Sequence, residues 1–411
     1  MRILYIIHSC IRGGATISFK NLVAGIREKG IEIVIVHPKP KAEDEVLVSE
    51  LKDLGCTCVQ LDVAVSYNKF GKNVLKYILR PVKIYWRKNI FYRQLRSIVL
   101  QERPDIIHTN TGVVHEGFLV AKKLNIPHVW HLREYQTKDF HMTIVPSLKR
   151  FKSMLKNSYT VCITKDIQDY FGLSNNRRAT VIYNPAMSEN AILKHESVNG
   201  YFLIANRISS EKGITDILEA FAEFTKKHGS FLLKIAGFGE EEYVNKMKEV
   251  CRRFGIFEKV EFLGFVSDVR ALMQKARALI VGSYNEGFGR MTAEANMLGI
   301  PVIGRNSGGT KEILELTGGG ILFNTTEEMK DAMMTIVAMS DEQNRNFMKR
   351  PQEKAIKLFS SEQHIRNVLE LYTDIFGMFY HTKAGLGGVN RGVALFVGIR
   401  NVSIPISSFT A

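Results

Sequence analysis

Cysteine is scarce in this chain, and the few cysteines are not arranged to form cross-links or to bind metal. Five cysteines occur among 411 residues, an odd number, and no two of them form a Cys-x-x-Cys pair or a zinc-site spacing. A disulfide-stabilised secreted domain and a structural zinc module are therefore disfavoured. We expect reduced, mostly buried thiols and a cytoplasmic protein that binds no metal.

Long apolar runs are also missing. No stretch approaches the roughly 18 to 20 apolar residues that cross a bilayer. The opening run Met1–Ile7 is shorter than the apolar region of a signal peptide. Neither a membrane-spanning helix nor a secretion signal is expected. The apolar content of 45% is that of a globular protein, so packed cores are possible.

Acidic residues are absent from one long segment. Between Asp62 and Glu102 the chain has nine lysines or arginines, seven aromatic residues and no acid, within a net charge of +15. Aromatic rings favour the headgroup depth of a bilayer, and each cation gains about 1 kcal/mol near anionic lipid. We therefore predict that residues 63–101 dock on an anionic membrane, peripherally on the inner face of the plasma membrane. The residues concerned are Lys69, Lys72, Lys76, Arg80, Lys83, Arg87, Lys88, Arg93 and Arg96, with Tyr67, Phe70, Tyr77, Tyr85, Trp86, Phe91 and Tyr92.

Two alternative roles for this segment remain open. A solvated helical face with its aromatic residues in the core would have the same composition. Nucleic acid would also suit basic and aromatic residues, but no recognised binding module accompanies them, so nucleic-acid binding is disfavoured.

The length and the order of the expected elements predict two α/β domains. A chain of 411 residues is too long for one ordinary core. A strand over Ile3–Ile7, a turn with Gly13 and Gly14, a helix over Thr16–Lys29 and a strand over Ile31–Val36 would begin a doubly wound sheet. We expect a first domain over 1–184, a second over 185–360, an amphipathic helix over 361–380 that returns to the first domain, and a tail over 381–411 without an assigned role.

The most informative motif lies in the second half and contains two carboxylates. Glu286-Gly287-Phe288-Gly289 follows an apolar run that predicts a buried strand, and Glu294 lies eight positions after Glu286 in a predicted helix. Free amides at the start of a helix attract anions, and a carboxylate can accept hydrogen bonds from neighbouring hydroxyls. The motif indicates a ligand with sugar or ribose hydroxyls. The plain alternative is a solvated loop acid and an acid stabilised by the helix dipole.

A second loop supplies positive charge. Arg207 and Lys212 lie five positions apart between a strand-like run, Phe202–Ala205, and a predicted helix, Ile214–Phe224. A guanidinium forms paired hydrogen bonds to phosphate oxygens and a lysine adds a mobile charge, so this loop suits a diphosphate. A third strand leads into Gly308-Gly309. Three such loops predict one composite site at the carboxyl edge of a parallel sheet.

Together these motifs resemble the retaining glycosyltransferases of family 4, of the bacterial polysaccharide-biosynthesis type. The resemblance rests on Arg207 with Glu211-Lys212-Gly213, on Glu286-Gly287-Phe288-Gly289 with Glu294, and on Gly308-Gly309, and it spans residues 1 to about 380. It implies an α/β chain of GT-B architecture, in which two Rossmann-like doubly wound domains face a cleft.

The resemblance also implies a role for each site residue. Arg207 and Lys212 would neutralise the leaving diphosphate, Glu294 would hold the ribose, and Glu286 would hold sugar hydroxyls. His131 lies in a segment similar to the family's acceptor-domain histidine segment at the cleft edge, and would contact a donor hydroxyl. The expected catalytic residues are His131, Arg207, Lys212 and Glu286; the expected donor-binding residues are Gly13, Gly14, Arg207, Lys212, Gly287, Phe288, Gly289 and Glu294.

The predicted function is retaining, metal-independent transfer of a hexose from a nucleotide diphosphate sugar to a lipid-linked or polysaccharide acceptor in cell-surface glycan synthesis. No cofactor is expected beyond the sugar nucleotide, which is a co-substrate. Two alternatives stay open: a nucleotide-sugar epimerase of the same fold, and a non-catalytic basic scaffold. A dehydrogenase is disfavoured because Gly237-Phe238-Gly239 lacks a third glycine and the acids of Glu240-Glu241-Glu242 would repel a pyrophosphate.

Overall fold

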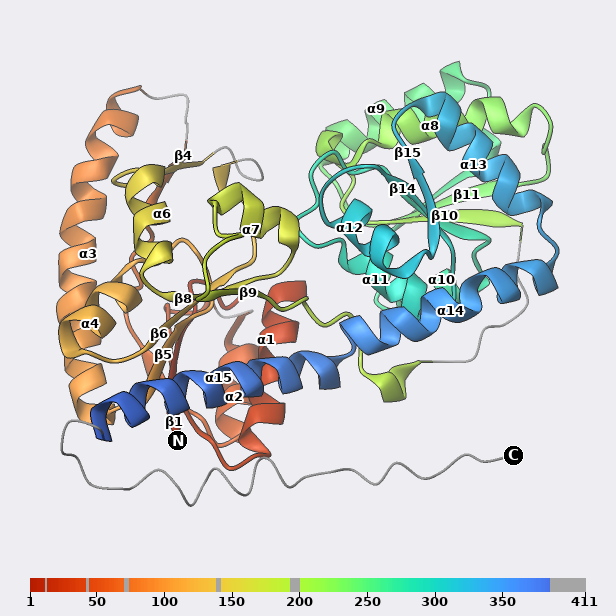
Figure 1. The fold of residues 1–411 in the computed structure, drawn as a ribbon. Coiled ribbons are helices and arrows are strands. Elements are labelled where there is room, and N and C mark those ends of the chain that lie inside the picture. The colour runs from red at the N-terminus through yellow and green to blue at the C-terminus, as the bar shows by residue number, and fades with distance from the viewer. Residues whose placement is uncertain (12, 42–43, 70–73, 138–141, 193–199, 385–411) are drawn as a thin grey trace, which may run out of the picture.

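The computed structural model describes residues 1–11, 13–41, 44–69, 74–137, 142–192 and 200–384. Figure 1 shows two α/β domains side by side, with a long pair of C-terminal helices running beneath both. Most of the tail predicted over 381–411, and residues 70–73 of the basic segment, lie outside the described residues. The two-domain α/β prediction is confirmed.

The first domain contains a seven-stranded parallel sheet with the order β3-β2-β1-β5-β6-β8-β9. Its strands are β1 (Arg2–Ile6), β2 (Glu32–His37), β3 (Thr57–Gln60), β5 (Ile106–Thr109), β6 (His128–Leu132), β8 (Tyr159–Cys162) and β9 (Ala179–Val181). A separate antiparallel pair is formed by β4 (Tyr67–Lys69) and β7 (Met142–Ile144). The sheet helices are α1 (Gly14–Arg27), α2 (Glu45–Asp53), α3 (Val74–Glu102), α4 (Glu116–Leu124), α6 (Leu148–Lys156) and α7 (Lys165–Phe171).

Alternation along β1 explains how both faces of this sheet become buried. Ile3 and Tyr5 contribute to the core under α1 and α2, whereas Leu4 and Ile6 contribute to the core under α3 and α4. A parallel sheet needs helices on both faces, so its strands are apolar at nearly every position. The basic helix α3 is therefore held by one face and presents the opposite face to solvent.

The second domain is also built on a parallel sheet, with six strands in the order β12-β11-β10-β13-β14-β15. Its strands are β10 (Tyr201–Ala205), β11 (Leu232–Ala236), β12 (Val260–Gly264), β13 (Ala278–Val281), β14 (Val302–Arg305) and β15 (Gly320–Phe323). Its helices are α8 (Ile214–Thr225), α9 (Glu241–Arg253), α10 (Val269–Lys275), α11 (Arg290–Met297), α12 (Gly308–Thr317) and α13 (Thr326–Ala338).

Two C-terminal helices connect the domains. The first is α14 (Asp341–Phe359), which starts at a capping box between Ser340 and Gln343 and packs against α11 and α12. The second is α15 (Ser361–Ala384), which crosses to the first domain and packs against α1 (Figure 1). The hydroxyl of Tyr372 on α15 lies 2.6 Å from the hydroxyl of Tyr5 and 2.5 Å from Nδ1 of His108, so a buried polar network fixes the crossing. None of the described helices is both long and apolar enough to cross a bilayer.

Candidate active site

Three loops of the second domain meet at one edge of its sheet, as the sequence predicts. They follow β10, β13 and β14, which are neighbours in the sheet and run parallel. Parallel neighbours end at the same edge, and the strand order reverses between β10 and β13. Ligands of doubly wound sheets bind at such a reversal. The glycine-rich and charged loops therefore lie where a nucleotide is expected.

Two of the predicted catalytic residues contact each other directly. Lys212 ends a single 3-10 turn before α8, and its Nζ lies 2.9 Å from Oε2 of Glu286 in the loop after β13. Both side chains are partly buried, with 19% and 25% of their surface exposed. The pair is thus open on one side. An incoming anion can bind the ammonium while hydroxyls bind the carboxylate.

Arg207 lies nearer the solvent than Lys212. Its Nη2 is 2.5 Å from Oε1 of Glu211, and the two side chains are 59% and 52% exposed. The loop itself is held in place because the backbone nitrogen of Tyr284 donates to the carbonyl oxygen of Glu211. Arg207 therefore lies at the rim of the site, where water screens its charge more than that of Lys212.

The loops after β13 and β14 pack so closely that only glycine fits. A Cβ on Gly309 would lie 2.2 Å from the carbonyl oxygen of Phe288, and a Cβ on Gly308 would lie 2.5 Å from that of Glu286. The amide of Gly309 donates to the Glu286 carbonyl over 2.7 Å. Gly289 has a φ of 83° and is the N-cap residue that precedes α11. The glycines thus position Glu286 relative to the start of two helices.

Glu294 lies in α11 and is almost fully buried. Burial raises the pKa of Glu294, which the neighbouring Arg290 opposes. Nε of Arg290 donates to Oε1 of Glu294 over 2.8 Å, and its Nη atoms donate to the carbonyl oxygens of Gly14 and Ala186. The sequence motifs did not single out Arg290, although its spacing of four positions from Glu294 on a helix was a usable signal.

The first domain brings Gly13 and Gly14 to this edge. Gly14 begins α1, and a Cβ on it would meet Nη1 of Arg290 at 2.9 Å, whereas a Cβ on Gly13 would meet nothing within 4 Å. The start of α1 therefore faces the second domain with open space beside it. Oγ1 of Thr164 also donates to the carbonyl oxygen of Gly287 over 3.2 Å. The contacts between the domains thus join Gly14 to Arg290 and Thr164 to Gly287.

His131 is fully buried, and its predicted contact with a donor hydroxyl stays a prediction. It is in β6, where the strand directs its side chain into the layer between the sheet and α15, and it is 0% exposed. Its ring lies 5.5 Å from that of His108 and 6.0 Å from that of His364, and burial lowers the pKa of His131 well below its ordinary value. Both ring nitrogens lack a hydrogen-bond partner within the described part of the chain.

Two family profiles match the two domains in turn. The profile of Glycosyltransferase Family 4 matches residues 12–186, and that of Glycosyl transferases group 1 matches residues 189–357. The chain is a glycosyltransferase of GT-B fold, of the family 4 type. This confirms the resemblance inferred from the motifs, and the match of the second profile includes all the charged residues of the second-domain site.

The relatives of this glycosyltransferase have low sequence identity to it, but the matches extend over most of the chain. Alpha-monoglucosyldiacylglycerol synthase of Acholeplasma laidlawii is 23% identical over 420 residues, which cover 88% of this chain and 94% of that protein. The enzyme of the same name from Streptococcus pneumoniae is 26% identical over 309 residues, which cover 68% of each chain. A protein from Haemophilus influenzae known only as a glycosyltransferase is 26% identical over 64% of this chain and 73% of its own length.

Solved structures support the fold. HepE of Anabaena, in complex with UDP, aligns with a TM-score of 0.71 at 18% identity over 91% of this chain and 100% of that one. A glycosyltransferase of Rickettsia africae aligns with a TM-score of 0.70 at 21% identity over 91% of this chain and 98% of its own. At such identities the likeness establishes the GT-B architecture and nothing finer.

The basic helix α3 carries fewer unpaired positive charges than its sequence predicts. Two of its cations have carboxylate partners from outside the segment: Arg87 pairs with Asp62, and Nζ of Lys88 lies 3.3 Å from Oε1 of the buried Glu116. The segment therefore carries less free positive charge than its composition implies. In contrast, Val82, Tyr85 and Trp86 project from α3 with 70%, 70% and 66% of their surface exposed. A solvated face with all its aromatic residues in the core does not describe α3.

Proposed function

We propose that this enzyme transfers a hexose, with retention of anomeric configuration and without a metal, from a nucleotide diphosphate sugar to a lipid acceptor at a membrane surface. The observation that carries the proposal is the ion pair of Lys212 and Glu286 at the strand-order reversal of the second sheet. It combines a cation for a diphosphate with a carboxylate for sugar hydroxyls. HepE was solved with UDP and with UDP-glucose, so UDP-hexoses are the first donors to test.

In the proposed reaction the acceptor hydroxyl oxygen bonds to the anomeric carbon on the face from which the diphosphate leaves. A phosphate oxygen of the leaving group takes the proton of the hydroxyl, so no side chain acts as nucleophile. Lys212, assisted by Arg207, stabilises the negative charge that grows on the diphosphate, which is the main electrostatic demand of the step. We assign to His131 a contact with a donor hydroxyl, which its two ring nitrogens, unpaired in the described part of the chain, support.

A lipid acceptor is favoured by the exposed ridge of α3, defined by Val82, Tyr85 and Trp86, which is flanked by cations. Large apolar side chains grouped on one exposed face commonly mark a partner or membrane surface. The names of two long relatives describe synthesis of a glucosyl diacylglycerol, which is a lipid product.

The reaction can be tested with labelled UDP-hexoses and membrane lipid vesicles. We expect label to move into the organic phase, and the product anomer to match that of the donor by NMR. If the donor alone is converted to an epimer, the enzyme is an epimerase instead. If no sugar nucleotide raises the thermal unfolding midpoint, the scaffold alternative is favoured and the proposal fails.

Glu294→Gln and Glu286→Gln are predicted to have different effects on ligand binding. Glu294→Gln should weaken UDP and UDP-hexose alike, because both contain the ribose. Glu286→Gln should weaken only UDP-hexose. Loss of one charge-assisted hydrogen bond of about 1.5 to 3 kcal/mol corresponds to roughly a 10-fold to 150-fold rise in Kd. Calorimetry measures both ligands, with Glu315→Gln, an exposed ion-paired acid on α12, as the matched control. Equal losses for both ligands in both variants would refute the division of roles.

Replacing the ridge residues Val82, Tyr85 and Trp86 by serine should weaken binding to anionic vesicles about a hundredfold, if each side chain loses about 1 kcal/mol of burial in the membrane. Lys88 is left unchanged, because its removal would leave the buried Glu116 without its cation. Leu100→Ser, at another exposed position of α3, is the control. Vesicle flotation measures the bound fraction of each variant. If the triple variant binds anionic vesicles as strongly as wild type does, the ridge does not contact the membrane.

A further inference from the structure

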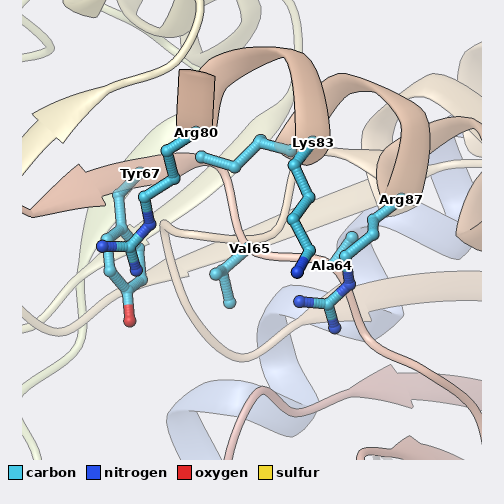
Figure 2. Close-up of a pocket in the computed structure, with 7 residues that line it drawn as sticks. Ala64, Val65, Tyr67, Arg80, Lys83 and Arg87 are labelled. Atoms are coloured by element: carbon cyan, nitrogen blue, oxygen red, sulfur yellow. The ribbon is translucent and has the colours of Figure 1, made fainter. Parts of the chain in front are cut away.

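A small cavity beside α3 is lined by three cations. Arg80, Lys83 and Arg87 extend from one flank of the helix toward the segment that carries Ala64, Val65 and Tyr67 (Figure 2). The cavity has a volume of about 200 Å³, and Ile84 completes its lining. The nitrogen ends of all three side chains point to the same side of the helix (Figure 2). The space is therefore positive at its charged wall and apolar at its floor.

The positive charge of this cavity is only partly neutralised. Arg87 pairs with Asp62 through two hydrogen bonds, but Arg80 and Lys83 have no carboxylate partner in the described part of the chain. Three cations less one carboxylate leave two uncompensated positive charges. A singly or doubly charged anion would balance them.

The spacing of the three cations on the helix is itself unfavourable. Positions 80, 83 and 87 are three and four residues apart, so their side chains lie on one face, where like charges repel. Folding alone gives no reason to gather them over a cavity. A bound anion would convert this repulsion into attraction.

The cavity is distinct from the donor site. Figure 1 shows α3 at the edge of the first domain that is opposite the second domain, and no residue of the Lys212 and Glu286 loops lines the cavity. It is adjacent to the ridge, because Val82 and Trp86 alternate along α3 with Arg80, Lys83 and Arg87. The ridge and the cavity can therefore face the same surface.

A larger cavity on the other flank of α3 is also basic, but it contains a buried carboxylate. It has a volume of about 630 Å³, and its lining contains the carboxylate of Glu116 and four cations, Lys88, Lys122, Lys123 and Arg150. Burial raises the pKa of Glu116, while the nearby Lys88 lowers it. The smaller cavity has no carboxylate among its lining residues.

We propose that the cavity formed by Arg80, Lys83 and Arg87 binds the phosphate of an anionic membrane phospholipid while the neighbouring ridge inserts among the acyl chains. The guanidinium groups donate to the phosphate oxygens and the ammonium adds charge, as expected for a phosphate site. The apolar floor of Val65 and Ile84 contacts the glycerol carbons. This inference rests on the proposed membrane docking and adds a specific headgroup site to it.

The test compares two double variants of equal charge change on the same helix. Arg80→Gln with Lys83→Gln removes the two unpaired cations of the cavity, and Arg93→Gln with Arg96→Gln removes two exposed cations outside it. Vesicles of phosphatidylcholine carry either phosphatidic acid or a fatty acid, matched in surface charge. Wild type and the control should prefer phosphatidic acid by about tenfold, the effect of one charge-assisted contact. The cavity variant should lose that preference.

The outcomes separate this inference from the docking on which it rests. If both double variants weaken binding equally to both vesicle types, docking holds but the attraction is diffuse and the headgroup site is refuted. If inorganic phosphate competes as well as phosphatidic acid vesicles, the cavity binds free phosphate and the lipid assignment is overturned. If wild type binds neither vesicle, the proposed docking itself fails. Transfer to a soluble acceptor confirms that each variant is folded.

Discussion

Lys212→Ala is expected to lower kcat/KM for hexose transfer by about a hundredfold to a thousandfold, the usual effect of removing one preorganised electrostatic contact. Nζ of Lys212 lies 2.9 Å from Glu286 in a partly buried site, so its charge is screened less than that of a surface lysine. Arg207→Ala should lower kcat/KM less, by about tenfold, because the guanidinium is largely exposed and already paired with Glu211. Lys212 is expected to have the larger effect because its side chain is more buried than that of Arg207.

The control for this prediction is Lys226→Ala. Lys226 also forms an ion pair, with Glu223, but on an exposed stretch at the end of α8 and outside the loops of the site. Its loss should leave transfer unchanged. Initial rates over a range of donor concentrations, together with the thermal unfolding midpoint, separate catalysis from folding. Wild-type turnover in a variant lacking both Lys212 and Arg207 would refute the assignment of the diphosphate site.

Mild acid is expected to destabilise the first domain much more than the second. Six histidines lie within or against the first domain, five of them buried and His8 partly exposed. Desolvation lowers their pKa values: to about 4 for His8, to about 3 for His128 and His364, and well below the ordinary range for His108, His115 and His131. Among described residues 200–360, His228 is the only histidine, and it is partly exposed.

The direction of the effect follows from proton binding. As the pH falls below the unfolded value of about 6.5, the unfolded chain protonates these rings while the folded chain keeps them neutral, so the free energy of unfolding falls. Between about pH 6.5 and pH 5.5 each ring contributes a loss of roughly 1 kcal/mol, and six rings several times that. Such a loss is a large part of the roughly 5 to 15 kcal/mol that stabilises an ordinary domain.

Tryptophan fluorescence can measure this because both tryptophans, Trp86 and Trp130, are in the first domain. In a Trp86→Phe background, the emission of the buried Trp130 should report unfolding in mild acid. His115→Phe is the informative variant, since the ring of His115 stacks on Phe151 and phenylalanine can replace it without titrating. The variant should take up about one proton fewer on unfolding. An unchanged proton uptake, or equal acid sensitivity of both domains, would contradict the prediction.

The sequence predicted most of the second-domain site because its signals are local. An apolar run, a glycine turn and a helix start each depend on a few consecutive residues, as in Glu286-Gly287-Phe288-Gly289 and the loop that ends at Lys212. The rule that parallel strands end at one edge then brought the loops together. The observed α8 ends one residue after its predicted end, Phe224. The family and the GT-B architecture were implied by the resemblance that these motifs carry.

Pairings between distant segments could not be predicted in this way. Lys88 and Glu116 belong to different helices, and nothing in the composition of residues 63–101 indicates that a buried carboxylate from outside takes up one of its charges. Arg290 contacts Gly14 across the two domains, a contact between residues 276 positions apart in sequence. His131 is buried beside α15, which begins at Ser361 and carries His364, whose ring lies 6.0 Å from that of His131.

The sequence by itself determined the fold class, the three site loops and the presence of a basic, aromatic helix, because these depend on periodicity, glycine geometry and residue chemistry along short stretches. Only the tertiary structure decided which charges are free. It neutralised Arg87 and Lys88, left Arg80 and Lys83 over a cavity, and buried His131. The physical reason is that the electrostatic state and the exposure of a side chain depend on all its neighbours in space, most of which are far away along the chain.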